Sequence, residues 1–346
     1  MKSSDIELLG DVVVYFDSGA LLGIWSSRGA IALYEEGIKP KQICCASVGA
    51  LIGPKCAEKN DLQSARETRE VFDDIETKGA HVIFSGFFRM AVNLLTSSYL
   101  HDDRGVARVM ETLDLEKIVH SPVEVLFVVR NETSGKEFRI FSTHEPRFKN
   151  NLKLLKGALF GAVRIPGGFP AGEFDGDIIS DGFTFAPIIE EMENTTCHTA
   201  FIFLNDCPYG GKDVKDMHWE RRLTRGIRSL ISYTNILAIK RFLDRRKDFY
   251  VFDYGLERRD HPVYKEVLEY SQNLERRGIP PTRRLVIISP REYIKTLSSS
   301  NFKGPKYSGK KLIRQGDLTV RGDEAERRTK EVMELLIEHI KTKEAH

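Results

Sequence analysis

The sequence predicts an α/β fold, in which helices cover both faces of a mostly parallel central sheet. Apolar runs of strand length alternate with helical patterns along the 346 residues, as they do in such folds. The first of these runs, 11–16 (DVVVYF), and the second, 42–46 (QICCA), each lead through a turn of small residues into a helical pattern. An apolar fraction of 41% is enough to supply a buried core.

Helices are expected after both of these strands and onward to residue 118. The helix after the first strand runs through AIALYEEG and ends at Gly37, because glycine readily adopts the backbone that closes a helix. The helix after the second strand begins at or just after Ser47. Further helical patterns span 61–79, 84–95 and 101–118.

Two hairpins are expected next. Strands at 122–131 and 136–142 flank a Glu-Thr-Ser-Gly turn. The second hairpin spans 172–182 and has Asp175-Gly176 at its tip, which is the strongest short hairpin signal in the chain.

The last part of the chain combines two buried strands with a long helix. The strands are expected at 197–206 and 283–290. The final helix is expected to begin near Asp323, where Glu326 completes a capping box. Between them, 298–311 (SSSNFKGPKYSGKK) has the composition of a loose segment.

Composition and charge exclude several classes of protein. Lys plus Arg number 52 and Asp plus Glu 50, so the formal net charge of +2 argues against a nucleic-acid binder. The five cysteines have no C-x-x-C spacing, which indicates neither a disulfide framework nor a zinc site. No apolar run approaches the roughly 18 residues of a membrane span, and none resembles a signal-peptide core. We expect a soluble, reduced, cytoplasmic protein.

A serine stands where the second strand is predicted to pass into its helix. A nucleophilic serine needs exposure at a strand end and N–H donors close by, and a sharp strand-turn-helix supplies both. The run Cys45-Ala46-Ser47-Val48-Gly49 has the small neighbours that such a turn requires, with Cys45 at the first glycine position of G-x-S-x-G. Taken alone, Ser47 also fits an ordinary helix N-cap.

Two other segments strengthen the nucleophile interpretation. SGALLG (18–23) is a small-residue turn between the first strand and its helix, and such turns leave backbone N–H groups free to bind an anion. The hairpin at 172–182 ends in Asp181-Gly182. By itself Asp181 also fits an ordinary turn residue.

In this order and spacing, the three segments resemble the patatin-like phospholipase family. That family has a glycine-rich oxyanion loop after its first strand, then a G-x-S-x-G elbow, and later an Asp-Gly motif. The run GAVRIPGGFPAGEFDGDIISDGF also resembles the segment that leads to the aspartate of the family. The resemblance covers roughly residues 10–210 well and the remainder loosely.

The resemblance implies a patatin-like fold, related to the α/β-hydrolases, and a Ser-Asp dyad. Ser47 is the expected nucleophile and Asp181 the proton acceptor, and an acyl-serine intermediate is then hydrolysed by water. Backbone N–H groups of Ser18, Gly19 and Ala20 form the expected oxyanion hole. The implied substrates are fatty acyl esters of phospholipids or lysophospholipids, and no metal or cofactor is implied.

The resemblance also suggests how the chain is divided. Residues 1–297 are expected to form the catalytic domain, and 298–346 a loop and helical extension packed on it. Peripheral contact with membranes and the oligomeric state stay open.

The motifs depart from the family pattern at several positions. Cys45 adds bulk beside the elbow, and Pro54 predicts a short or kinked helix after it. Ala20 has a Cβ, so a positive φ there is strained, and Phe183 replaces a small residue after the Asp-Gly pair. These departures keep two alternatives open: a catalytically impaired lipid-binding or regulatory protein, and an acyltransferase.

Other features have two interpretations. The stretch 219–248 is either a helix pair packed on the sheet or a basic amphipathic element that meets anionic lipid headgroups. The aromatic face at 84–88 is either core or a wall or lid for an acyl chain. As catalytic candidates, His198 and His218 lack any supporting pattern, and Cys45 is expected to point into the sheet.

Overall fold

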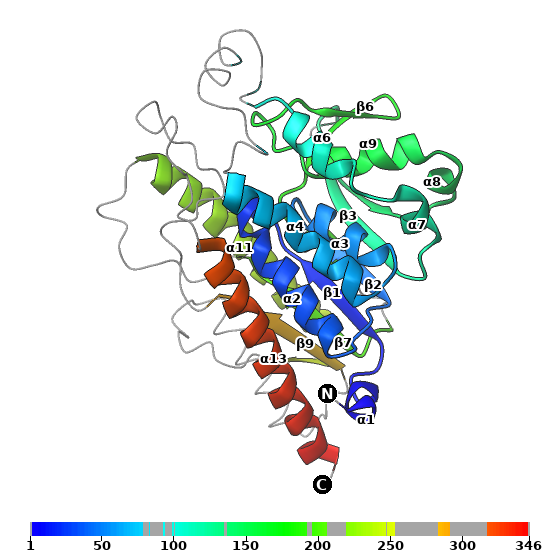
Figure 1. The fold of residues 1–346 in the computed structure, drawn as a ribbon, viewed down its shortest axis with the longest axis vertical. Coiled ribbons are helices and arrows are strands. Elements are labelled where there is room, and N and C mark those ends of the chain that lie inside the picture. Colours follow the sequence, from blue (N-terminus) through cyan, green and yellow to red (C-terminus); the bar gives the residue numbers. More distant parts are fainter. Residues whose placement is uncertain are drawn as a thin grey trace.

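The computed structural model shows a mixed, mostly parallel sheet with helices on both faces (Figure 1). The residues that it describes are 2–78, 83, 93, 99, 101–134, 137–191, 196–205, 219–246, 248–252, 283–290 and 317–344. The predicted α/β class is confirmed. The expected segments 84–95 and 298–311 fall almost wholly or wholly outside the described residues.

Within the described residues the sheet has nine strands. They are β1 (Val12–Phe16), β2 (Gln42–Cys45), β3 (Glu124–Asn131), β4 (Glu137–Ser142), β5 (Gly172–Phe174), β6 (Asp177–Asp181), β7 (Thr199–Phe203), β8 (Phe249–Phe252) and β9 (Arg283–Ile288). Their order is β5-β6-β3-β2-β1-β7-β9-β8, and β4 pairs with β3. Neighbours from β3 through β8 run parallel, whereas β4, β5 and β6 add the antiparallel pairs of the two predicted hairpins.

Helices connect most of these strands. They are α1 (Ser3–Glu7), the 3₁₀ helix η1 (Ala20–Gly23), α2 (Ile24–Glu35), α3 (Gly49–Ala57), α4 (Leu62–Lys78), α6 (Arg104–Met110), α7 (Leu115–His120), α8 (Pro146–Asn150), α9 (Leu152–Ala162), α10 (Ala186–Glu191), α11 (Trp219–Arg245) and α13 (Asp317–Glu344). None of the described helices is both long enough and apolar enough to cross a lipid bilayer.

The central strand β1 shows why both faces of the sheet are covered. All five of its residues are buried, and successive side chains point to opposite faces. Val12, Val14 and Phe16 belong to the apolar cluster under α2, α3 and α13. Val13 and Tyr15 belong to the cluster under α10 and α11. A continuously apolar strand therefore joins two cores.

Local turn chemistry ends these elements where it was predicted to. Gly37 takes φ 85°, and its N–H bonds the Tyr34 carbonyl at 3.0 Å, while the Ile38 N–H bonds the Leu33 carbonyl at 3.0 Å. This pair of bonds closes α2. At the tip of the second hairpin, the Asp175-Gly176 pair has φ values of 54° and 83°, as a tight two-residue turn requires.

The stretch 101–118 forms two short helices, so the expectation of one helix was wrong. The Asp114 side chain accepts the N–H of Lys117 at 3.1 Å and starts α7 with a new N-cap. Val106 in α6 and Leu113 in the break before α7 are buried in the same core. The apolar spacing therefore looks continuous although the backbone turns.

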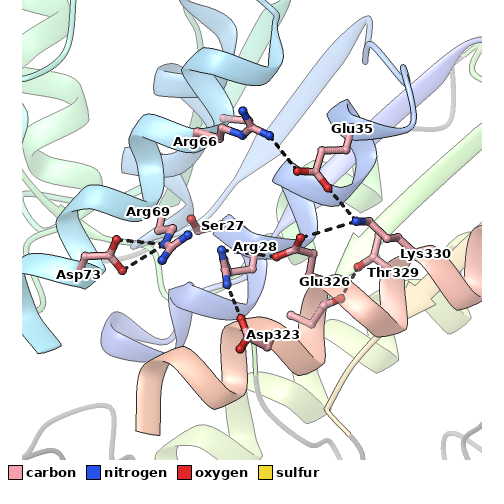
Figure 2. Close-up of polar contacts among 12 residues, drawn as sticks. Ser27, Arg28, Glu35, Arg66, Arg69, Asp73, Asp323, Glu326, Thr329 and Lys330 are labelled. Atoms are coloured by element: carbon pink, nitrogen blue, oxygen red, sulfur yellow. Dashed lines mark hydrogen bonds and ion pairs between the residues drawn. The ribbon is translucent and has the colours of Figure 1, made fainter. Parts of the chain in front are cut away.

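The last helix begins at Asp317, which is earlier than expected, and Asp323 and Glu326 lie inside it. Instead of capping a helix end, both carboxylates pair with Arg28 on α2, and the Glu326 contact is 3.4 Å (Figure 2). The two carboxylates of the predicted capping box therefore form ion pairs with another helix. Their spacing does not mark the start of α13.

The same cluster of charges connects three helices (Figure 2). Glu35 on α2 accepts from Lys330 on α13 at 2.7 Å and from Arg66 on α4 at 3.1 Å. In Figure 1, α2 and α13 lie side by side on one face of the sheet. The division of the chain at residue 297 remains a prediction.

The stretch 219–248 contains one long helix, α11, where a helix pair was one expectation. In its second half, Ile236, Ile239 and Phe242 are buried against the sheet. Leu230 and Tyr233 remain exposed, at 68% and 43%. One part of α11 is therefore core, and one part presents apolar groups to solvent.

Candidate active site

The predicted elbow lies at the carboxyl end of β2. Ser47 has φ 52°, a left-handed backbone that is uncommon for a residue with a side chain. The Gly49 N–H bonds the Ala46 carbonyl at 2.9 Å, and the Ala50 N–H bonds the Ser47 carbonyl at 2.8 Å. The chain thus passes from strand to helix through three residues, Ala46 to Val48, and a turn this sharp is of the kind that can project a nucleophile.

Small residues around the elbow permit this close approach. A Cβ on Gly49 would lie 2.6 Å from the carbonyl oxygen of Phe16 on β1. A Cβ on Gly53 would lie 2.3 Å from Cys45 Sγ. The bulk that Cys45 adds to the elbow is therefore accommodated by Gly53, one turn into α3. As predicted, α3 is short, at nine residues with Pro54 inside.

Asp181 ends β6 beside Ser47, with its side chain fully buried. Burial raises the pKa of the Asp181 carboxyl from 3.8 to about 7, and interactions with the Ser47 hydroxyl and the Phe183 N–H limit that rise. The Phe183 N–H donates to Oδ1 at 2.7 Å. Among the described residues, no donor reaches Oδ2 with standard hydrogen-bond geometry. The contact between Asp181 and the Ser47 hydroxyl is thus longer or less well aligned than a standard hydrogen bond.

The Asp-Gly turn holds this carboxylate in place. The Asp181 N–H donates to the Arg164 carbonyl at 2.9 Å. A Cβ on Gly182 would lie 2.7 Å from Val128 Cγ1 on β3. Phe183 takes φ 61°, a backbone in which a small residue is less strained. The glycine is required by close packing, while Phe183 carries the strain of the turn.

The loop after β1 differs from its predicted form at one donor. The Ser18 N–H donates to Asp17 Oδ1 at 2.8 Å, so it is not free to bind an oxyanion, and Ser18 is removed from the expected set. Gly19 carries the positive φ, 141°, and Ala20 begins η1 without one. The strain that a positive φ would bring to Ala20 therefore does not arise.

Two buried asparagines near this loop were not predicted. Asn235 on α11 donates to Asp17 Oδ1 at 2.8 Å and accepts from the Thr184 hydroxyl at 2.5 Å. It thereby connects the loop after β1 with the segment after Asp181. Asn205 is the second residue after the end of β7, as Ser47 is after the end of β2. A polar residue at the carboxyl end of a buried parallel strand is a signal that could have found it.

An apolar cavity of about 80 Å³ begins at Ser47. One wall is the face of α3 that carries Val48, Leu51, Ile52 and Lys55. Most of the remaining lining is apolar and comes from α4, α6 and the segment after α9, while Glu67, Thr68 and Thr112 are its polar members. Lys55 is eight positions after Ser47, which corresponds to about 12 Å along a helix.

Charged groups gather where this cavity reaches Lys55. Lys55 Nζ contacts Glu58 at 2.9 Å, Glu67 at 2.7 Å and the Thr112 carbonyl at 3.2 Å. The side chains of Lys55 and Glu58 are only 13% and 3% exposed. The cavity therefore has a nucleophile candidate at one end and a mostly buried ion-pair cluster at the other.

Comparisons with known proteins add little to this geometry. No protein-family model matches the chain, and no curated protein matches it. Among solved structures, it is similar to VipD from Legionella pneumophila, at 11% sequence identity and a TM-score of 0.37. The match covers 94% of this chain but 66% of that one, so this chain spans less than two thirds of VipD.

The other catalytic candidates lie in unsuitable places. His198 precedes β7, so it lies at the amino-terminal ends of the parallel strands, whereas Ser47 lies at their carboxyl ends. The Nδ1 atom of His198 accepts the Asp11 N–H at 3.3 Å. Burial raises the pKa of the Cys45 thiol well above its ordinary value. His218 lies outside the described residues. In the described part of the chain, no three side chains of metal-binding type come together.

Proposed function

We propose that the protein hydrolyses acyl esters, with Ser47 as nucleophile and Asp181 as base. The observation that supports this most is their combination: Ser47 lies in a left-handed turn at the mouth of an apolar cavity, beside a buried carboxyl with a pKa of about 7. A base with a pKa near the operating pH is well suited to proton transfer.

The steps follow from this placement. Ser47 Oγ attacks the ester carbonyl carbon while its proton passes to Asp181. The oxyanion that forms accepts hydrogen bonds from backbone N–H groups of Gly19 and Ala20. The C–O bond to the alcohol then breaks, and Asp181 returns the proton to the leaving alcohol. Water attacks the acyl-serine with Asp181 again as base, which releases the acid.

The substrate class that suits the cavity is a fatty acyl ester, such as that of a phospholipid or lysophospholipid. The lining near Ser47 is apolar, and Lys55 limits the length along α3 to about 12 Å. Each C–C bond of about 1.5 Å advances an extended chain by about 1.25 Å, so about ten carbons fit. Contact with a lipid surface through exposed Leu230 and Tyr233 of α11 is part of this proposal.

One observation supports the alternative, a lipid-binding protein without turnover. The Ser18 N–H is already bonded to Asp17, which leaves fewer donors for an oxyanion. An acyl-binding cavity does not need those donors, whereas hydrolysis does.

Labelling with a fluorophosphonate separates the two. We expect the native protein, with a lipid interface supplied, to gain the mass of one phosphonyl group, and Ser47→Ala to gain none. A folded native protein that takes no adduct contradicts hydrolysis and leaves the lipid-binding alternative. If the unlabelled protein, supplied with an acyl ester and an acceptor alcohol, forms the new ester in preference to the free acid, the activity is acyl transfer.

Leu51→Trp is expected to shorten the preferred acyl chain. Leu51 lines the cavity midway between Ser47 and Lys55, so an indole there excludes the distal carbons. At about 0.8 kcal/mol per buried methylene, loss of two or three methylenes lowers kcat/KM about tenfold to a hundredfold. The measurement is the ratio of rates on decanoyl and butyryl p-nitrophenyl esters. Val320→Trp, at a site 69% exposed on α13, is the matched control. An unchanged ratio in Leu51→Trp rules out this cavity as the acyl site.

A further inference from the structure

The buried side chain of Asn205 contacts the loop after β1 with its amide nitrogen and α2 with its amide oxygen. Its Nδ2 donates to the Asp17 carbonyl at 2.6 Å and to the Ser18 carbonyl at 3.2 Å. Its Oδ1 accepts from Ser26 on α2, from the N–H at 3.1 Å and from the hydroxyl at 2.7 Å. Both amide protons and the oxygen are thus engaged, which fixes the orientation of the amide.

These contacts determine the direction of the Gly19 N–H. In a planar trans peptide the C=O and the N–H point in opposite directions. Because the Ser18 carbonyl is turned toward Asn205, the N–H of the same peptide, that of Gly19, is turned away from it. No acceptor within the described residues takes this N–H. The peptide between Asp17 and Ser18 has the same arrangement. Its carbonyl accepts from Asn205, and its N–H, which is that of Ser18, donates to Asp17 Oδ1.

Gly19 needs such an external constraint. At φ 141° it has no side-chain sterics to hold the peptide in one direction. A Cβ on Gly19 would lie 3.3 Å from Asn205 Cβ, so the two residues are in close contact. An oxyanion donor is useful only when its direction is fixed before reaction.

We propose that Asn205 is a positioning residue, which aims the Gly19 N–H at the oxyanion formed on Ser47. This inference rests on the proposed function. Asn205 does not touch the reacting atoms and acts through the peptide between Ser18 and Gly19.

The C-terminal helix takes part in this arrangement. Arg321 on α13 donates to the backbone carbonyl of Asn205 at 3.1 Å. Its guanidinium lies 5.4 Å from the ring centroid of Trp25 on α2, and the side chain is almost fully buried. Asn205 is therefore bonded by α13 at its backbone carbonyl and by α2 at its amide oxygen.

The test is Asn205→Asp. The carboxyl group keeps the shape of the amide but offers at most one proton to the two loop carbonyls, so at least one loop peptide is free to turn. We expect the rate of phosphonylation of Ser47, and kcat on a short acyl ester, to fall about 10²–10³-fold, as for loss of one oxyanion donor. KM should stay within about twofold. The midpoint of the pH profile should also stay in place, because Asp181 is not touched.

Two further variants keep the test decisive. Asn131→Asp is the matched control, because this buried asparagine accepts the N–H groups of Thr133 and Ser134 at 2.9 and 3.1 Å, which a carboxylate also does. It should label at the native rate. Ser26→Ala removes one contact from the Asn205 oxygen, and we expect about a threefold to tenfold loss of rate. It replaces Asn205→Asp if that variant does not fold.

The outcomes distinguish this inference from the function beneath it. Native labelling that is lost in Ser47→Ala, together with native rates in Asn205→Asp or in its replacement, overturns the role of Asn205 alone. A KM that rises while kcat holds also overturns it. No adduct on the native protein removes the proposed function, and this inference with it.

Discussion

Asp181→Asn is expected to remove turnover and, above neutral pH, to make the fold more stable than the native one. Asparagine keeps the shape of the side chain, and its oxygen still accepts the Phe183 N–H that Asp181 Oδ1 accepts at 2.7 Å. It cannot take the proton of Ser47, and loss of a general base costs about 10²–10⁴ in rate. The same substitution removes a buried charge.

The direction of the stability change follows from the pKa. In the folded protein the pKa of Asp181 is raised from 3.8 to about 7, chiefly by burial. The protonated carboxyl is thus the form that folding favours, and its contribution to stability is complete below the ordinary pKa and is lost as the pH rises through about 7. A shift of this size corresponds to a few kcal/mol, at about 1.4 kcal/mol per pKa unit.

Unfolding midpoints at pH 4 and pH 8.5 measure this. Asp181→Asn and the native protein should lie closer together at the lower pH, and the variant should be the more stable at the higher one. Asp175→Asn, at the exposed tip of the same hairpin, should change neither stability nor rate appreciably. The native rate should rise with pH through about 7. Turnover by Asp181→Asn at the native rate excludes Asp181 as the base.

The strands and turns were predictable from sequence because local chemistry determines them. β1 is apolar at every position since it joins two cores, and Gly37 and the Asp175-Gly176 tip have backbones that few other residues accept. The start of α13 was not predictable. Asp323 and Glu326 have the spacing of a cap, but Arg28, 295 residues before Asp323, is their partner. Only the folded chain reveals that contact.

The candidate site, too, was predictable from sequence only where local chemistry determines it. The sequence places Ser47 and Asp181 at strand ends, and the fold brings the two together. The loop donors depend on tertiary contacts, since Asp17 takes the Ser18 N–H and Asn205 orients the next peptide. The effect of an unusual residue in this loop therefore depends on the residues that it contacts, as the effect of Cys45 at the elbow depends on Gly53.

Gly49→Ala is expected to destabilise the fold and to abolish labelling of Ser47. In most helices alanine is preferred over glycine by about 0.5–1 kcal/mol, so helix propensity alone predicts a gain. At this position the new Cβ would lie 2.6 Å from the Phe16 carbonyl oxygen and 3.0 Å from Phe16 Cβ. Neither can move without β1, so α3 must shift outward. We expect a loss of about 3 kcal/mol in the free energy of unfolding.

Gly157→Ala is the matched control, because it makes the same change inside α9. Its new Cβ would lie 3.6 Å from the Glu173 carbonyl oxygen, which is ordinary contact, so helix propensity should decide and the variant should be slightly more stable. Denaturant unfolding of both variants measures the opposite signs, and fluorophosphonate labelling measures the elbow. A Gly49→Ala protein that is as stable as Gly157→Ala and still labels at Ser47 contradicts the close approach of α3 to β1. Opposite signs, with labelling retained only in Gly157→Ala, show that this approach is what holds Ser47 in its left-handed turn.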